Sequence, residues 1–275
     1  MASQFETYHG PGIVKNHGYD GPISVSKGTR NPERAISDFI NAAGKLGYPE
    51  IQDATNFDTP SGVQRNLRFI SPEGIRQDVV SKYLRPKLQD PAYPNLHVLV
   101  EHNVVRVVVE NGKATGIEMA PRKMSNDTSR EQWIRFVKAR KMVVVSCGAL
   151  GTPLVLERSG LGNQKILEKH GVPVVFNLPG VGSNYQDHQM MVYSYRSSLN
   201  PDETLDSLLR GQVDPAALIK SNDSMLGWNA QDVTSKIRPT DLQASHFDGR
   251  LQEIWDSKYA PYSDRPLVHL TLLSG

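Results

Sequence analysis

The segment from Gly148 to Gly162 constrains the fold more than any other part of the sequence. It reads Gly-Ala-Leu-Gly-Thr-Pro-Leu-Val-Leu-Glu-Arg-Ser-Gly-Leu-Gly and follows an apolar run, Lys141–Cys147, that is typical of a buried strand. Thr152 is a natural N-cap, Pro153 suits the first helical position, and Gly160 suits the left-handed residue that follows a helix. The pattern predicts a strand, a glycine turn and a capped helix, which is half of a nucleotide-binding crossover.

Two interpretations of this unit stay open on the residues alone. Backbone N–H groups at such a turn can contact a ligand, but an ordinary α/β unit needs the same helix-end residues. One set of positions carries a resemblance: Gly148-Ala149, Thr152-Pro153, Val155-Leu156 and Ser159-Gly160-Leu161-Gly162. Together they match every specified position of the second signature of the glucose–methanol–choline (GMC) flavoprotein oxidoreductases, so the segment resembles that family.

The resemblance covers nearly all of the chain. The stretch Asn177–His188 is similar to the family's segment ending in Gly-Val-Gly-x-Asn-Leu-Gln-Asp-His, with Tyr185 in place of the usual leucine. Within the family, the stretches His17–Ser26 and Lys236–Thr240 most resemble fungal alcohol (methanol) oxidases. We therefore expect a mixed α/β fold that combines a partial FAD-binding, Rossmann-like domain with part of an antiparallel-sheet substrate domain.

The first signature of such flavoproteins is missing from the sequence. No Gly-x-Gly-x-x-Gly occurs, although the pyrophosphate of a dinucleotide needs that tight turn and the close backbone approach that it allows. The family's catalytic histidine lies near its C-terminus. The resemblance therefore implies an internal fragment of a longer enzyme, with no catalytic residue of its own and the catalytic histidine beyond its C-terminus.

The resemblance also implies which residues contact the cofactor, FAD. Val104 aligns with the family's valine whose backbone contacts the adenine of the flavin cofactor. The resemblance places Asp187 and His188 close to the flavin site. The strand-end turn beside the adenosine matches Ser146, Cys147, Gly148 and Ala149. Arg76, on an expected helix from Ser71 to before Pro86, resembles a family arginine. A purely structural role for the Asp187-His188 pair remains open, because adjacent side chains rarely form a catalytic dyad.

Two other kinds of site find little support. A serine hydrolase needs Gly-x-Ser-x-Gly, but Val144 occupies the first glycine position before Ser146. The eight histidines are scattered and no His-Glu-x-x-His occurs, so we expect no metal site.

Composition limits the partners and the compartment. A net charge of +2 argues against nucleic-acid partners, and no apolar run is long enough to span a membrane. The single cysteine, Cys147, excludes an internal disulfide and is expected to be a buried, inert thiol. The N-terminus has no secretory signal. We expect a cytoplasmic or peroxisomal protein that is not secreted.

The expected elements follow from local patterns. Asn31 and Pro32 begin a helix, and Asn111-Gly112 between β-branched runs predicts a hairpin. A polar loop is expected at 121–133. The expected organisation has three parts: an N-terminal linker and helix segment at 1–69, a partial FAD-binding domain at 70–178, and a partial substrate-binding domain at 179–275.

The resemblance implies the oxidation of a primary alcohol to an aldehyde, by hydride transfer to FAD and then electron transfer to oxygen. The partners would then be a small-molecule alcohol and oxygen, and a homo-oligomer stays open for the full-length protein. The alternative is a catalytically inactive, truncated GMC fragment or interaction remnant.

Overall fold

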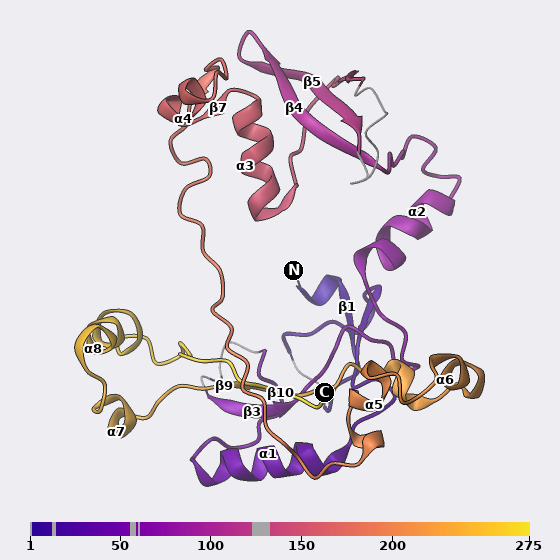
Figure 1. Cartoon of the computed structure of the whole chain (residues 1–275), viewed down its shortest axis with the longest axis vertical. Coiled ribbons are helices and arrows are strands. Elements are labelled where there is room, and N and C mark those ends of the chain that lie inside the picture. Colours follow the sequence, from indigo (N-terminus) through magenta and orange to yellow (C-terminus); the bar gives the residue numbers. More distant parts are fainter. Residues whose placement is uncertain (1, 13–14, 56–58, 60, 123–132) are drawn as a thin grey trace. The chain divides into compact units, whose positions relative to one another are not determined.

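The computed structural model describes residues 2–12, 15–55, 59, 61–122 and 133–275. It divides the chain into two compact units: the first combines Met1–Leu96 with Tyr195–Gly275, and the second is His97–Ser194 (Figure 1). These units differ from the three expected parts, because residues 70–96 pack with the two ends of the chain. Most of the expected loop at 121–133 lies outside the described residues.

The second unit contains the expected hairpin. Strands β4 (His102–Glu110), β5 (Lys113–Pro121) and β6 (Arg135–Lys138) form an antiparallel sheet in that order. Asn111 and Gly112 connect β4 to β5 with φ of 51° and 74°. Positive φ at both positions is what a tight two-residue hairpin requires, so the Asn-Gly prediction is confirmed.

The glycine-rich segment forms helix α3 (Gly148–Arg158) and strand β7 (Leu161–Gly162). Gly160 follows the C-cap with φ of 77°, and a Cβ there would collide with the carbonyl oxygen of Pro173. The prediction of a left-handed glycine at this helix end is therefore confirmed. Helix α4 (Gln164–Lys169) follows, and the short strand β8 (Phe176–Asn177) pairs with β7 in parallel.

The start of α3 corrects the prediction for Thr152 and Pro153. The helix begins at Gly148, its N-cap residue is Cys147, and no side chain caps it there. Thr152 lies inside the helix, where its Oγ1 accepts a hydrogen bond from the Cys147 N–H at 3.0 Å. Pro153 also lies inside the helix, where its ring removes one intrahelical hydrogen bond. Thr152 and Pro153 each suit a helix start and therefore predicted one at that point, but the helix begins earlier, at Gly148.

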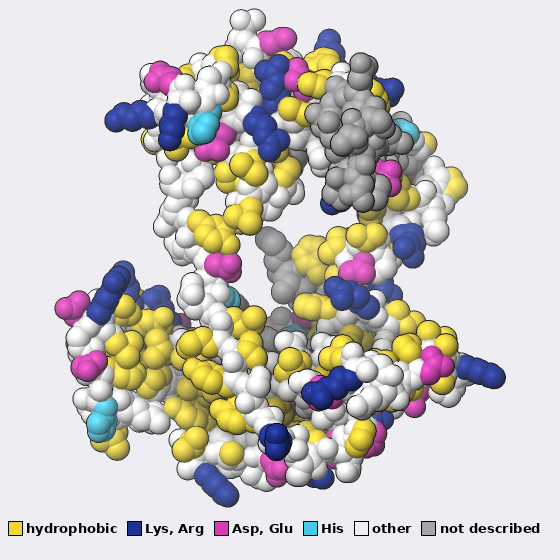
Figure 2. Space-filling view, in the orientation of Figure 1, with side chains coloured by type: hydrophobic (Ala, Val, Ile, Leu, Met, Phe, Trp, Pro, Cys, Tyr) yellow, Lys and Arg dark blue, Asp and Glu magenta, His cyan; other side chains and the backbone are white. Residues whose placement is uncertain are grey.

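The apolar run before α3 is not a buried strand in this structure. Residues 142–147 form no strand and pair with no described strand, and Met142 and Val144 are 73% and 74% exposed. Figure 2 shows other apolar side chains that also reach the surface. Cys147 is exposed as well, so the expectation of a buried thiol is wrong. Such a run needs strands beside it and layers over both faces, and the described residues supply neither.

The first unit is built on a second antiparallel sheet, in the order β10 (Thr271–Leu273), β9 (Gln231–Lys236) and β3 (Gly62–Arg65). Helix α1 (Glu33–Lys45) covers one face of it, because Ile36 and Ile40 pack on Val63 and Val233. Helix α1 starts one residue later than expected, with Pro32 as N-cap. Strands β1 (Glu6–Tyr8) and β2 (Ile23–Val25) form a separate parallel pair.

Short helices complete the first unit. No helix starts at Ser71, because residues 72–74 turn back on themselves; the helical stretch there continues through Pro86. The remaining helical elements are η1 (Ala2–Gln4), η2 (Val80–Leu84), α2 (Arg85–Gln89), η3 (Pro201–Glu203), α5 (Asp206–Leu209), α6 (Pro215–Ser221), η4 (Ser224–Gly227), α7 (Asp241–Ala244), α8 (Gly249–Ile254) and η5 (Trp255–Tyr259). The mixed α/β class with antiparallel sheets is confirmed. None of the helices in the described part of the chain has the length and apolar character needed to cross a membrane.

A buried ion pair joins distant parts of the first unit. Arg68 Nη2 donates to Asp232 Oδ1 at 2.7 Å, and the same oxygen accepts from Trp228 Nε1 at 2.7 Å. Arg68 also donates to the carbonyl oxygens of Gln231 and Lys27, at 3.0 and 2.5 Å. Burial lowers the pKa of the Arg68 guanidinium, and the charge of Asp232 opposes that shift. The guanidinium thus connects the segment before α1 to β9.

We predict that Arg68→Met destabilises the first unit by about 3–5 kcal/mol, because it leaves the Asp232 carboxylate buried without its countercharge. Urea denaturation followed by tryptophan fluorescence measures this. Arg210→Met is the matched control, since Arg210 pairs with Asp206 at an exposed site of the same unit and should cost less than about 1 kcal/mol. Equal effects of the two substitutions would contradict the assignment.

For α3, we predict that Thr152→Ala destabilises the second unit by about 0.5–1.5 kcal/mol, because the Cys147 N–H loses its acceptor. Thr152→Ser keeps the hydroxyl and should retain most of the stability. Urea denaturation midpoints of the two variants test the contact. A serine variant as unstable as the alanine variant would show that the methyl group, not the hydroxyl, matters.

Candidate functional site

The N-terminus of α3 is open to a ligand. Gly148 has φ of 80°, and an ideal Cβ on it would meet no atom within 4 Å. Ser146, Cys147, Gly148 and Ala149 are all exposed. The first N–H groups of a helix have no intrahelical acceptor, and no side chain caps this end of α3. The helix dipole adds partial positive charge, so the turn suits an electronegative ligand group.

Val104 lies on β4, an edge strand of its sheet, and is half-buried. It pairs with Met119, and the register shifts between Val104 and Arg106. Two hydrogen bonds attach β4 to α3: the Val107 N–H donates to Ser159 Oγ at 2.8 Å, and Arg158 Nη1 donates to the Val105 oxygen at 3.4 Å. Both bonds lie at the C-terminal end of α3, the opposite end from the Gly148 turn.

Asp187 and His188 do not form an acid–base dyad. Asp187 Oδ1 accepts from the backbone N–H of His188 at 2.8 Å, and Oδ2 accepts from the Tyr185 hydroxyl at 2.8 Å. The hydrogen bond from Tyr185, followed by the one from the His188 backbone, lowers the pKa of the Asp187 carboxyl. Both residues are exposed. The bonding pattern agrees with the structural interpretation of the pair.

The structure brings only some of the predicted site residues together. Ser146 to Ala149 form one continuous turn, and β4 is attached to the same helix. The turn before Asp187 also approaches α3, since a Cβ on Gly182 would lie 3.4 Å from Glu157 Oε1 and 3.8 Å from Pro153 Cβ. Arg76 is separate: it is exposed in the first unit and precedes the helical stretch instead of lying on it.

These residues fit one side of a dinucleotide. Free backbone donors and a left-handed glycine without steric obstruction suit the polar adenosine end of FAD. They do not enclose it, because every residue of the turn is exposed. The smaller described cavity, about 450 Å³ beside Asn163 and Asn177, lies near α4 and away from the turn.

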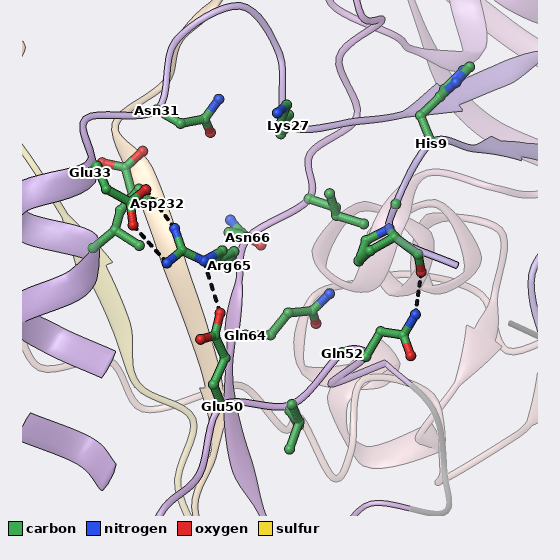
Figure 3. Close-up of a pocket in the computed structure, with 15 residues that line it drawn as sticks. His9, Lys27, Asn31, Glu33, Glu50, Gln52, Gln64, Arg65, Asn66 and Asp232 are labelled. Atoms are coloured by element: carbon green, nitrogen blue, oxygen red, sulfur yellow. Dashed lines mark hydrogen bonds and ion pairs between the residues drawn. The ribbon is translucent and has the colours of Figure 1, made fainter. Parts of the chain in front are cut away.

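The larger described cavity lies in the first unit and was not predicted. It has a volume of about 760 Å³ and is bounded by the loop at His9–Pro11, the segment Glu50–Gln52 and strand β3 (Figure 3). Its polar lining residues are His9, Lys27, Asn31, Glu33, Glu50, Gln52, Gln64, Arg65, Asn66 and Asp232. Sequence patterns gave no signal for it, because its walls come from segments far apart in the chain.

The guanidinium of Arg65 in this cavity is paired with two carboxylates. Arg65 donates to both oxygens of Glu33 at 2.7 Å and to Glu50 Oε1 at 2.9 Å, as Figure 3 shows. The hydrogen bonds from Arg65 lower the pKa of Glu33, and those to Glu33 raise the pKa of Arg65. The cavity is therefore a polar, ion-paired groove without an activated nucleophile. In the described part of the chain, no cluster of His, Cys, Asp or Glu side chains could hold a metal ion.

Comparisons with known proteins identify the family. The GMC oxidoreductase family model matches residues 3–190. The alcohol oxidase of Candida boidinii is 32% identical over all of this chain, which covers 42% of that protein. An oxygen-dependent choline dehydrogenase from Cronobacter sakazakii is 34% identical over 65% of the chain and 30% of its own length.

A solved structure agrees in fold. The formate oxidase of Aspergillus oryzae, solved in a study of its FAD modification, superimposes with a TM-score of 0.75. At 17% identity it covers 99% of this chain and 47% of its own, and this likeness concerns the fold alone. The chain thus spans about two fifths of the length of the curated alcohol oxidases that it matches. Membership of the family indicates FAD as the cofactor. This chain is a member of the GMC oxidoreductase family.

Proposed function

We propose that this chain forms part of an FAD-dependent oxidoreductase that oxidises a primary alcohol to an aldehyde. The observation that carries the proposal is the open glycine turn at the start of α3, whose sequence matches the family signature and whose backbone suits a dinucleotide. The alcohol substrate is proposed from the similarity to alcohol oxidases over the whole chain.

The residues of the second unit have separate roles in this proposal. The backbone N–H groups of Gly148 and Ala149 would donate to the adenosine end of FAD, and Ser146 and Cys147 would line the approach to it. The backbone of Val104 would border the adenine. Asp187 and His188 would lie nearer the flavin ring. None of them would act as the catalytic base.

When bound, the flavin supplies the hydride acceptor, and the protein supplies position and electrostatics. In this arrangement the chain's contribution is to orient the cofactor. Proton removal from the alcohol requires a base that we do not assign to any described residue. The domain assignment stays part of the proposal: residues 70–178 would contribute to the FAD-binding domain, and 179–275 to the substrate domain.

The alternative, an inactive fragment or interaction remnant, is favoured by one observation: the sequence contains no Gly-x-Gly-x-x-Gly. Within this polypeptide, the two phosphates of FAD would lack the close backbone donors that such a turn supplies. Both proposals expect the polypeptide of 275 residues to be inactive by itself. They differ on whether it supports activity when it forms part of a complete GMC fold.

We predict that the polypeptide, purified with excess FAD, shows no flavin absorption and releases no peroxide with short primary alcohols. A chimera in which it replaces the matching segment of the Candida boidinii alcohol oxidase should be yellow and active. In that chimera, Gly148→Val should lower the flavin content about tenfold, since a β-branched residue is strained at positive φ and blocks the turn.

Gly171→Val is the matched control in the chimera. Gly171 also has positive φ, 67°, and open space around it, but it follows α4 and lies outside the turn. It should keep its flavin content. A yellow, active polypeptide without the added segments would overturn the argument from the missing turn, and a colourless, folded chimera would favour the inactive remnant.

A further inference from the structure

The larger cavity of the first unit opens where a second segment separates from the outer edge of β3. At Val63 the two are still paired: the Val63 N–H donates to the Pro49 oxygen at 2.9 Å, and the Ile51 N–H donates to the Val63 oxygen at 2.8 Å. Beyond this point no backbone hydrogen bond joins them in the part of the chain that the structure describes. Gln52 then lines the cavity from one segment and Arg65 from the other (Figure 3).

The edge of β3 carries unpaired backbone groups into this cavity. Successive residues of a strand direct their N–H and C=O groups to opposite sides. The Asn66 N–H donates to the Asp232 oxygen on β9 at 2.9 Å, whereas Val63 bonds to the outer segment. Arg65 therefore directs its backbone groups away from β9, and Leu67 is the next alternate residue. Both line the cavity, and neither has a backbone hydrogen-bond partner among the described residues.

Three carboxamide side chains beside this edge also keep hydrogen-bonding capacity. Each uses one end in a bond within the protein: Asn31 its oxygen, and Gln52 and Asn66 their nitrogens. The opposite ends of the three groups have no partner in the described part of the chain. Because a side chain that is already fixed loses little entropy on binding, these groups are prepared to meet a ligand with one donor and two acceptors.

The charges of the lining side chains balance. Glu33 and Glu50 both pair with Arg65, and Lys27 supplies a second positive charge. Asp232 also lines the cavity, but its carboxylate is paired with a buried guanidinium. A ligand that carries a net charge would therefore find no excess of the opposite charge in this cavity, which favours an uncharged ligand with many hydrogen-bonding groups.

We propose that this cavity binds a short, uncharged peptide in extended form, which adds to the edge of β3 by pairing its backbone with Arg65 and Leu67. A peptide backbone repeats its donor and acceptor on one side at every second residue, as this edge does. Contact with both residues needs a span of about 7 Å, or about three peptide residues. The volume of about 760 Å³ is within the ordinary range for small-ligand sites. The proposal does not depend on flavin binding.

Backbone amide NMR of the full chain tests the free edge and its occupation. Without peptide, the amides of Arg65 and Leu67 should exchange about tenfold faster than those of Val63 and Asn66, which is the effect of about one net hydrogen bond. The probe is a pool of acetylated, amidated tripeptides built from uncharged residues. At millimolar concentration it should shift the resonances of Arg65 and Leu67. Slow exchange at both amides of the free chain, or no shift with the pool, would overturn the proposal.

The geometry of pairing is tested with N-methylated forms of the tripeptide that binds best. Methylation on the edge that faces β3 should weaken binding about tenfold, since it removes backbone donors, while methylation on the other edge should change it little. Equal losses for both edges, or sorbitol shifting the same amides at least as strongly, would show that backbone pairing is not what this cavity recognises.

A substitution in the cavity wall provides an independent check. Gln52→Trp should abolish the peptide-induced shifts, because the indole occupies the space beside the edge. Gln89→Trp is the matched control, since Gln89 is exposed in the same unit and does not line the cavity. The amide spectrum of each variant reports whether it is folded. Peptide binding that persists in a folded Gln52→Trp variant would contradict the assignment.

Discussion

A guanidinium leaves water only if acceptors meet its N–H groups, and the first unit is organised around that constraint at Arg68. Its donors reach Asp232 on β9 and the carbonyl oxygens of Lys27 and Gln231, which come from distant parts of the chain. The carboxylate also accepts from Trp228. Because these contacts join the segment before α1 to the central strand of the sheet, the N-terminal and C-terminal stretches fold as one unit.

The second unit is held together differently. Its helix α3 is attached to β4 through Ser159, and Gly160 allows the close turn into β7. The run before α3 pairs with no described strand, and its side chains of Met142 and Val144 are exposed. The glycine turn that we propose as the cofactor contact follows directly after this run. Among the described residues, the position of this turn therefore depends on α3.

Local backbone rules explain which features the sequence could predict. Asn111-Gly112 and Gly160 need positive φ, a requirement that neighbouring residues do not change, and both predictions are confirmed. Thr152 and Pro153 were assigned to a helix start because each residue suits that position in isolation, but the helix begins at Gly148. The family and the mixed α/β class followed from the signature, and the roles of the site residues remain proposals.

Long-range contacts explain what the sequence could not predict. Arg68 and Asp232 are far apart in the chain, and neither stands in a pattern that indicates a buried pair. The same holds for His17 with Asp53 and for the walls of the cavity. The burial of Cys147 was misjudged for a related reason, because an apolar run indicates burial without showing what covers it.

The central claim is that the turn at Gly148 and Ala149 contacts the adenosine end of FAD. Backbone amide NMR of the chain, titrated with millimolar FAD, tests it directly because weak contacts still move amide resonances. The account predicts shifts at the Gly148 and Ala149 amides and at Val104, with little change at Gly171. Unchanged resonances at Gly148 and Ala149, or shifts confined to residues of the first unit, would contradict it.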